Sequence, residues 1–271
     1  MSIEVSDGVG ATAAPMLEVR DLVKSFGPVE ALRGVSFGVQ AGEVLGLIGD
    51  NGAGKSTLIK CVAGIIRPDS GRILVGSNVV EPSSPREAHA LGIETVHQDL
   101  ALIDSLDVTG NLFLNREIMY RPHAVGWMNK RRMHHQARDI LENLHINIPS
   151  VRFPIEKLSG GQRQAVAVGR SVAWGRRIVL MDEPAAALGV EQSQHVLELI
   201  RTLRDRGLVV LLISHNMHEV LEVCTRAVVL RHGAAVADLA LEGITTRDLV
   251  QLITTGALAR RDNAHVPSSP R

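Results

Sequence analysis

The sequence is poor in aromatic residues, cysteine and long apolar runs, and each shortage excludes a class of protein. Aromatic residues make up 3% of the 271 residues, which argues against nucleic-acid binding through aromatic stacking platforms. The two cysteines, Cys61 and Cys224, are far apart within apolar segments, so we expect buried, reduced thiols of a cytosolic protein. No apolar run reaches the length of a membrane-spanning helix.

The sequence also lacks an excess of either charge. Lys and Arg total 29, as do Asp and Glu, so the net charge is zero and binding of nucleic acid or anionic lipid through bulk charge is not supported. A hydrophobic content of 45% is ample for a core. The length suits one large α/β domain, or one domain with an inserted subdomain. Residues 1–14 have no cationic start followed by an apolar block, which predicts a flexible tail, not a signal peptide.

A glycine-rich loop between an apolar run and a helical pattern is the strongest local signal. Residues 44–48 predict a buried strand, and apolar residues recur at helical spacing after the loop. The loop fits the pattern G-x-x-x-x-G-K-S/T, whose backbone N–H groups and helix N-terminus bind nucleotide phosphates. Lys55 would reach the β- and γ-phosphates and Ser56 would bind Mg²⁺. A chance Gly-rich turn would lack this context. The loop residues are Gly49, Asp50, Asn51, Gly52, Ala53, Gly54, Lys55, Ser56 and Thr57.

Two adjacent acids follow a second apolar run. Residues 178–181 predict a buried parallel strand, and Asp182 and Glu183 come at its carboxyl end. That is where the carboxylates of a nucleotide site are placed in open α/β sheets. Asp182 would hold Mg²⁺ through its water shell, and Glu183 would polarise the attacking water as a general base. Two acids on a surface turn are the alternative, and the preceding apolar run argues against it.

Two single residues and one short segment carry weaker signals. A third apolar run, residues 208–213, brings His215 to the same sheet edge, where a γ-phosphate contact and a structural role are equally supported. Phe26 falls in a predicted turn, residues 24–28, where its ring either stacks on a purine or covers a sheet edge. A second anion site is predicted where a helix begins with a capping serine, although the same sequence pattern would occur at the start of any well-capped helix. Its residues are Ser159, Gly160, Gly161 and Gln162.

The remaining segments predict an α/β fold with a helical insertion. Residues 16–23 and 31–39 alternate as strands of an antiparallel sheet. Ser84 caps a helix that Gly92 ends, residues 227–237 form a hairpin, and 246–258 form a last helix. Residues 100–174 read as mainly helical, with cations dense at 130–132. For the histidines near those cations, a solvated basic helix is favoured over a metal site.

In their order and spacing, these segments resemble the ATP-binding cassette (ABC) ATPase family over about residues 16–255. Within it, the sequence is most similar to the ATPase subunits of bacterial monosaccharide importers of the ribose, xylose and fructose type. That closer similarity is carried by residues 97–102, 111–114 and 186–190.

The resemblance implies a P-loop NTPase core of the ABC type, with a parallel RecA-like part, an antiparallel β subdomain and an inserted helical subdomain. It implies one ABC ATPase domain at 15–255, divided into a nucleotide-binding core (15–96 and 175–255) and a helical subdomain (97–174). Residues 1–14 and 256–271 would be flexible tails.

The resemblance also assigns roles that the residues alone left open. Phe26 would stack on adenine, and His215 would be the switch histidine. Gln98 would contact Mg²⁺ and the attacking water and link to the membrane subunit. Ser159, Gly160 and Gly161 match the signature that closes over ATP bound to the opposite subunit.

The implied mechanism is a head-to-tail dimer with two ATP molecules at its interface, using ATP and Mg²⁺. Closure and reopening of the dimer would drive membrane permease subunits, which dock just after Gln98 and on the helical insertion. We expect a homodimer, or pairing with a second cassette, at the cytoplasmic face of the inner membrane. A periplasmic sugar-binding protein would be an indirect partner, and nucleic acid would not be one.

Two positions depart from the family pattern. Ala185 stands where the family usually has Thr, and Gly189 stands where a carboxylate usually crosses the dimer, so coupling between the two sites is in question. The alternatives are a soluble ABC ATPase acting on DNA or ribosomes and an importer of a non-sugar substrate. The intact Glu183 and His215 argue against a non-hydrolysing regulatory cassette, and the absence of membrane spans argues against an exporter.

Overall fold

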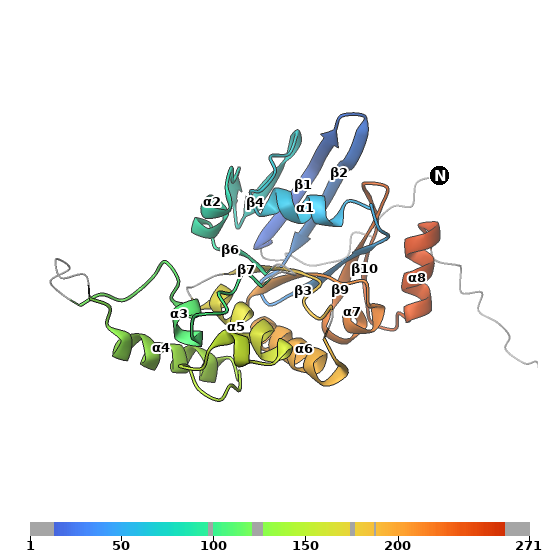
Figure 1. Ribbon diagram of the computed structural model, residues 1–271. Coiled ribbons are helices and arrows are strands. Elements are labelled where there is room, and N and C mark those ends of the chain that lie inside the picture. The colour runs from blue at the N-terminus through green and yellow to red at the C-terminus, as the bar shows by residue number, and fades with distance from the viewer. Residues whose placement is uncertain (1–13, 97–99, 121–126, 174–176, 187, 258–271) are drawn as a thin grey trace, which may run out of the picture.

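Two β-sheets and the helices around them form the body of the molecule (Figure 1). The computed structural model describes residues 14–96, 100–120, 127–173, 177–186 and 188–257. One sheet is antiparallel and has the order β2-β1-β4-β5. Its strands are β1 (Leu17–Phe26), β2 (Val29–Val39), β4 (Ser70–Val75) and β5 (Asn78–Val80).

The second sheet has the order β10-β9-β3-β8-β7-β6 and is parallel except for its edge strand β10. Its strands are β3 (Val44–Gly49), β6 (Ile93–Val96), β7 (Ile178–Asp182), β8 (Val209–Ile213), β9 (Arg226–Arg231) and β10 (Ala234–Ala240). The helices are α1 (Lys55–Val62), α2 (Pro85–Ala90), α3 (Val108–Leu112), α4 (Lys130–Asn143), α5 (Gly160–Val172), α6 (Val190–Asp205), α7 (Met217–Val223) and α8 (Thr246–Thr255), with a 3₁₀ turn η2 (Ile155–Lys157).

The parallel strands are buried on both faces, as their continuous apolar runs predict. Successive side chains of β8 alternate between two hydrophobic clusters: Val210 and Leu212 belong to one, Val209 and Leu211 to the other. The first cluster contains the buried faces of α3 to α8, and the second contains α1 and the antiparallel sheet. Helix α1 therefore lies between the two sheets, and α3, α5 and α6 cover the opposite face of the parallel sheet (Figure 1).

The local helix signals are confirmed. The Ser84 hydroxyl accepts from Glu87 N at the start of α2, and Gly92 takes the left-handed conformation after its end. Gly256, with φ +79°, ends α8 at Thr255, so the last helix is shorter than the predicted 246–258. Among the described residues, no helix combines the length and apolar character needed to span a bilayer.

The predicted turn at 24–28 is wrong in extent. Strand β1 continues to Phe26, which pairs with Val29, so only residues 27 and 28 remain in the turn. Gly27 has φ +58°, which suits a tight hairpin connection. The alternation ends early in the sequence because Lys24 and Ser25 are polar, yet this part of the sheet is only half-buried and tolerates them.

The segment predicted to be helical holds α3, α4, η2 and α5, together with an antiparallel bridge between Met119 and Met128. The exposed cations at 130–132 begin α4, and no group of three or more potential metal-ligating side chains occurs in the described ranges.

Candidate functional site

The phosphate loop connects β3 to α1, and two of its glycines occupy positions that no other residue could take. Gly49 has φ +152°, and a Cβ there would lie 2.2 Å from the carbonyl oxygen of Leu230. Gly54 has φ +105°, and its Cβ would lie 2.5 Å from Ala31 O. Both the backbone conformation and the surrounding backbone therefore require glycine, because a Cβ would force neighbouring main chain to move.

Lys55, the first residue of α1, is held by the loop itself. Its Nζ donates to the carbonyl oxygens of Gly49 (2.7 Å) and Asp50 (2.9 Å). Burial lowers the pKa of Lys55, while the charges of Glu183, Asp50 and Asp182 act in the opposite direction. The ammonium group thus lies at the loop, and a nearby anion would stabilise its charged form.

The N-terminus of α1 differs from those of most other helices in the described chain. Gly54 is its N-cap and supplies no side-chain acceptor, and the first turn contains no acidic residue. By contrast, Ser84 caps α2 and Asp107 caps α3 through side-chain oxygens. The first N–H groups of α1 therefore lack a side-chain acceptor, and an anion such as a phosphate can accept from them.

The two acids follow β7 as predicted. Asp182 ends the strand, and Glu183 turns away from it with φ +51°, its N–H donating to Ile213 O at 2.9 Å. Glu183 Oε1 lies 3.2 Å from His215 Nδ1, and the two side chains are 31% and 70% exposed. The strand ends thus bring the proposed base and the histidine into direct contact.

One cavity of about 680 Å³ brings most of the predicted residues together. It combines the β1–β2 hairpin, the phosphate loop, the end of β7 and the turn between β9 and β10. The predicted residues that line it are Phe26, Asn51, Gly52, Ala53, Gly54, Lys55, Ser56, Thr57, Asp182 and Glu183. Gly49 and Asp50 contribute through the carbonyls that hold Lys55. His215 lines a neighbouring cavity of about 330 Å³, which it shares with Glu183.

Ser56 and Asp182 fit a magnesium ion. Both line the phosphate cavity, and Mg²⁺ is usually held by one or two protein ligands together with substrate phosphates and water. Gln98, the third predicted metal ligand and a predicted catalytic residue, lies outside the described residues.

Seven residues that line the phosphate cavity were not predicted from the sequence: Pro28, Val29, Glu30, Ala31, Arg33, Ile213 and His232. Val29, Glu30 and Arg33 come from β2, and His232 comes from the β9–β10 turn. The two segments are joined by the bond from Arg33 N to Gly233 O, at 2.7 Å. No local pattern marks these positions, because only the packing of the β2 end against that turn brings them to the nucleotide loop.

Phe26 extends into this cavity from the end of β1. It is 47% exposed, and Lys24 Nζ lies 5.6 Å from the centre of its ring. An aromatic ring that is half-exposed beside a phosphate loop is better suited to stacking on a base than to covering a sheet edge.

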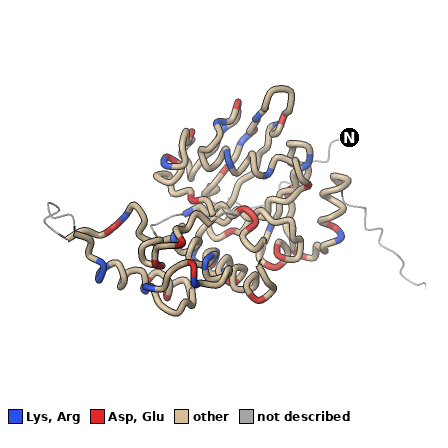
Figure 2. The backbone as a smooth tube through the Cα atoms, in the orientation of Figure 1, with Lys and Arg blue, Asp and Glu red and all other residues tan. Residues whose placement is uncertain are grey.

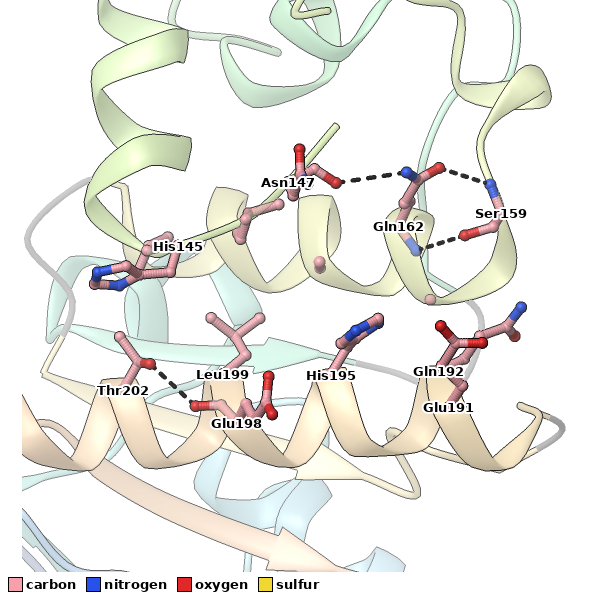
Figure 3. Close-up of a pocket in the computed structure, with 14 residues that line it drawn as sticks. His145, Asn147, Ser159, Gln162, Glu191, Gln192, His195, Glu198, Leu199 and Thr202 are labelled. Atoms are coloured by element: carbon pink, nitrogen blue, oxygen red, sulfur yellow. Dashed lines mark hydrogen bonds between the residues drawn. The ribbon is translucent and has the colours of Figure 1, made fainter. Parts of the chain in front are cut away.

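The predicted signature forms a separate site between α5 and α6 (Figure 3). Ser159 Oγ accepts from Gln162 N at 3.2 Å, and Gln162 Oε1 accepts from Ser159 N at 3.1 Å, which forms a capping box. Gly161 allows close approach of α6, since an added Cβ would lie 3.1 Å from Gln192, and Gly160 allows close approach of Leu188, just before α6, at the same distance.

The signature does not line the phosphate cavity. Ser159, Gly161 and Gln162 line a different cavity, of about 550 Å³, whose far end is formed by His145 and Thr202 (Figure 3). The phosphate loop and the signature of one chain thus line separate cavities, and the predicted residues are divided between them.

Comparison with known proteins assigns the chain to a family. The family model described as ABC transporter matches residues 32–186. The chain is 44% identical to the xylose/arabinose import ATP-binding protein XylG of Sulfolobus acidocaldarius, over 90% of this chain and 96% of that protein. It is 45% identical to the fructose import ATP-binding protein FrcA of Rhizobium meliloti, over 89% and 94%.

Solved structures agree with this assignment. The structure of MJ1267, an ATP-binding cassette of an ABC transporter, superimposes with a TM-score of 0.76 at 28% identity, over 88% of this chain and 96% of that one. The predicted fold, with a P-loop core and both types of sheet, is confirmed. The phosphate loop, the acid pair and the signature thus stand on a known framework, and the chain belongs to the ABC transporter family as one of its ATP-binding cassettes.

Proposed function

We propose that this cassette is the ATP-hydrolysing subunit of a sugar importer, working at the cytoplasmic face of a membrane with separate permease subunits. The arrangement of Lys55, Asp182 and Glu183 around one cavity is the observation that carries the ATPase activity. The sugar substrate is supported by the similarity to proteins named for xylose/arabinose and fructose import, which the chain matches over nearly their whole length.

The residues of the two cavities have separate roles in ATP hydrolysis. The N-terminus of α1 and Lys55 bind the β- and γ-phosphates, and Phe26 stacks on the base. Ser56 and Asp182 would hold Mg²⁺, which neutralises charge on the phosphate oxygens. Glu183 accepts the proton of the attacking water. His215, which contacts Glu183 at 3.2 Å, orients that carboxylate and meets the γ-phosphate.

Pairing of two cassettes explains why the signature stands apart from the phosphate cavity. In a head-to-tail dimer, Ser159 and the glycines after it would close over the ATP held by the other chain, and each pocket would need both chains. We expect a homodimer, with a periplasmic sugar-binding protein as an indirect partner.

Uptake of labelled sugars tests the proposed substrate class. Cells that lack this chain should lose uptake of one monosaccharide among xylose, arabinose, fructose and ribose, and the wild-type chain should restore it. Lys55→Ala should fail to restore uptake because the loop loses its phosphate-binding cation. Normal uptake of all four sugars without the chain would exclude them as substrates, while purified protein would still report its ATP turnover separately.

A further inference from the structure

A hairpin between α3 and α4 carries the most exposed aromatic side chains of the described residues. Met119 and Met128 form its antiparallel bridge, and Tyr120 N donates to Trp127 O at 2.9 Å. This register places Tyr120 directly opposite Trp127. The two side chains are 51% and 71% exposed, and Met128 is 45% exposed. In a protein with few aromatic residues, this concentration of exposed apolar surface calls for a partner.

A cluster of cations follows the hairpin at once. Lys130, Arg131 and Arg132 are exposed and form the first turn of α4, which has no acidic residue. Within the described part of the chain, none of the three makes an ion pair. Figure 2 shows these cations at the same end of the molecule as the hairpin.

The position of these cations is unfavourable for the helix itself. The N-terminus of a helix carries a partial positive charge, so cations in the first turn destabilise it. Between residues 115 and 132 the sequence holds five Lys or Arg and one acidic residue, whereas the whole chain is neutral. The positive charge is therefore concentrated in this segment. An anionic partner would offset the repulsion among these cations and between them and the N-terminus of α4.

Exposed Trp and Tyr beside cations are typical of a surface that meets lipid headgroups. The amphipathic rings prefer the membrane–water interface, and Lys and Arg clusters are attracted to anionic lipid phosphates. Single-stranded nucleic acid is also bound by aromatic residues and cations, but in grooves that follow its backbone. Here the hairpin arms extend from the edge of the molecule beyond α3 (Figure 1), and such a projection suits a flat surface better.

We propose that residues 118–120 and 127–129, with the first turn of α4, bind directly to an anionic bilayer surface. Tyr120 and Trp127 lie at the headgroup level, and the cations of α4 contact lipid phosphates. The permease is also expected to dock on the helical insertion, so the bilayer contact is tested with the purified chain alone, without permease or nucleotide.

Vesicle binding by the purified full-length chain tests this proposal. The chain should sediment with vesicles of phosphatidylcholine mixed with phosphatidylglycerol, should not sediment with phosphatidylcholine alone, and should dissociate as salt rises. Binding should shift tryptophan emission to shorter wavelength as Trp127 leaves water. The shift should disappear in Trp127→Phe, whereas that variant should keep most of its binding because an aromatic ring remains.

Two charge-reversal variants distinguish binding through this cationic patch from binding through the overall charge of the protein. Changing Lys130, Arg131 and Arg132 together to Glu should weaken binding to the anionic vesicles by at least about 100-fold, because three attractive charges are lost and three repulsive ones are added. The substitution favours the N-terminus of α4, so thermal stability should not fall. The matched control changes the exposed Arg72, Arg206 and Arg247 to Glu and should bind vesicles almost as the wild type does.

Three results would overturn the proposal. These are no binding to the anionic vesicles, an equal loss of binding in the control variant, or tight binding to single-stranded RNA without an emission shift on vesicles. The last would identify a nucleic-acid site instead. ATP turnover of both triple variants should equal that of the wild type, so failure of this proposal leaves the proposed function intact.

Discussion

At the scale of single residues, Lys55 has two competing sets of partners. Two loop carbonyls accept from its ammonium group in the structure, while phosphate oxygens would attract it more strongly because they are charged. Burial lowers the pKa of this lysine below its ordinary value of 10.5. The folded protein therefore releases the Lys55 proton at a lower pH than the unfolded chain does, and the destabilising effect of the buried charge fades as the pH rises towards 10.5.

Nucleotide binding should reverse this pKa shift and take up protons. Bound phosphates favour the charged amine, so ATP affinity should fall as the pH rises through the lowered pKa of Lys55. Calorimetric titrations just below pH 10.5, in buffers of different ionisation enthalpy, should show net proton uptake on binding. Lys55→Arg is the control, since guanidinium does not titrate there, and it should bind without that uptake. Equal proton uptake by both proteins would assign the titration to another group.

Glu183 should be needed for turnover and dispensable for binding. Its left-handed backbone and the contact with His215 hold the carboxylate at the cavity, where it can accept a proton from water. We expect Glu183→Gln to lower ATP turnover by about 10²- to 10⁴-fold while ATP affinity, measured by fluorescence titration, changes little. Steady-state turnover near the wild-type rate would exclude Glu183 as the base.

Gly189 offers a test of the departure from the family pattern. It is the N-cap of α6, with φ −70° and no side-chain cap, and apart from its two neighbours in the chain no described residue lies within 4 Å of where its Cβ would be. The substitution Gly189→Asp therefore introduces no strain. It should stabilise the protein by only about a few tenths of a kcal/mol, because glycine is itself an acceptable N-cap residue.

Gly189→Asp also restores the carboxylate that the family usually places there. If that charge couples the two ATP sites, the Hill coefficient for ATP hydrolysis should rise in Gly189→Asp and stay unchanged in Gly189→Asn, which caps the helix without the charge. An identical response of both variants would show that the carboxylate has no such role here.

At the scale of elements, the sequence predicted best where the signal is local. The phosphate loop, the acid pair and the cap at Ser159 were all found because each is contained within one strand, turn or helix start. The end of β1 was misjudged because Lys24 and Ser25 interrupt the apolar alternation, although the strand continues through them to Phe26. Pairing with β2 overrides the local pattern there, as tertiary context often does.

Helix α5 shows how one serine can serve stability and function separately. Ser159 caps the helix through its hydroxyl, and the same hydroxyl would meet the nucleotide of a second chain. Ser159→Ala should lower the free energy of unfolding by about 1 kcal/mol and also reduce ATP turnover. Ser159→Asn keeps a good cap, so it should regain the stability but not the turnover, as measured by denaturant unfolding and steady-state kinetics. Full turnover in the Asn variant would limit Ser159 to capping.

At the scale of the whole molecule, sequence reasoning missed what the packing of distant segments creates. Glu30, Arg33 and His232 join the phosphate cavity only because β2 packs against the β9–β10 turn. By contrast, the two helix starts, at α1 and α5, were predicted because each has its own local signal in the sequence. No local sequence pattern could predict that the phosphate loop and the signature line separate cavities of one chain.

Mixing two inactive variants tests whether each pocket is shared between chains. Lys55→Ala should inactivate the phosphate loop, and Ser159→Arg should block the signature, so neither protein alone should hydrolyse ATP. In a mixed head-to-tail pair, one pocket carries both defects, while the other combines an intact loop from one chain with an intact signature from its partner. The mixture should therefore regain ATP turnover that rises with protein concentration. If each chain completed its own pocket, mixing would restore nothing, because every pocket would keep its single defect.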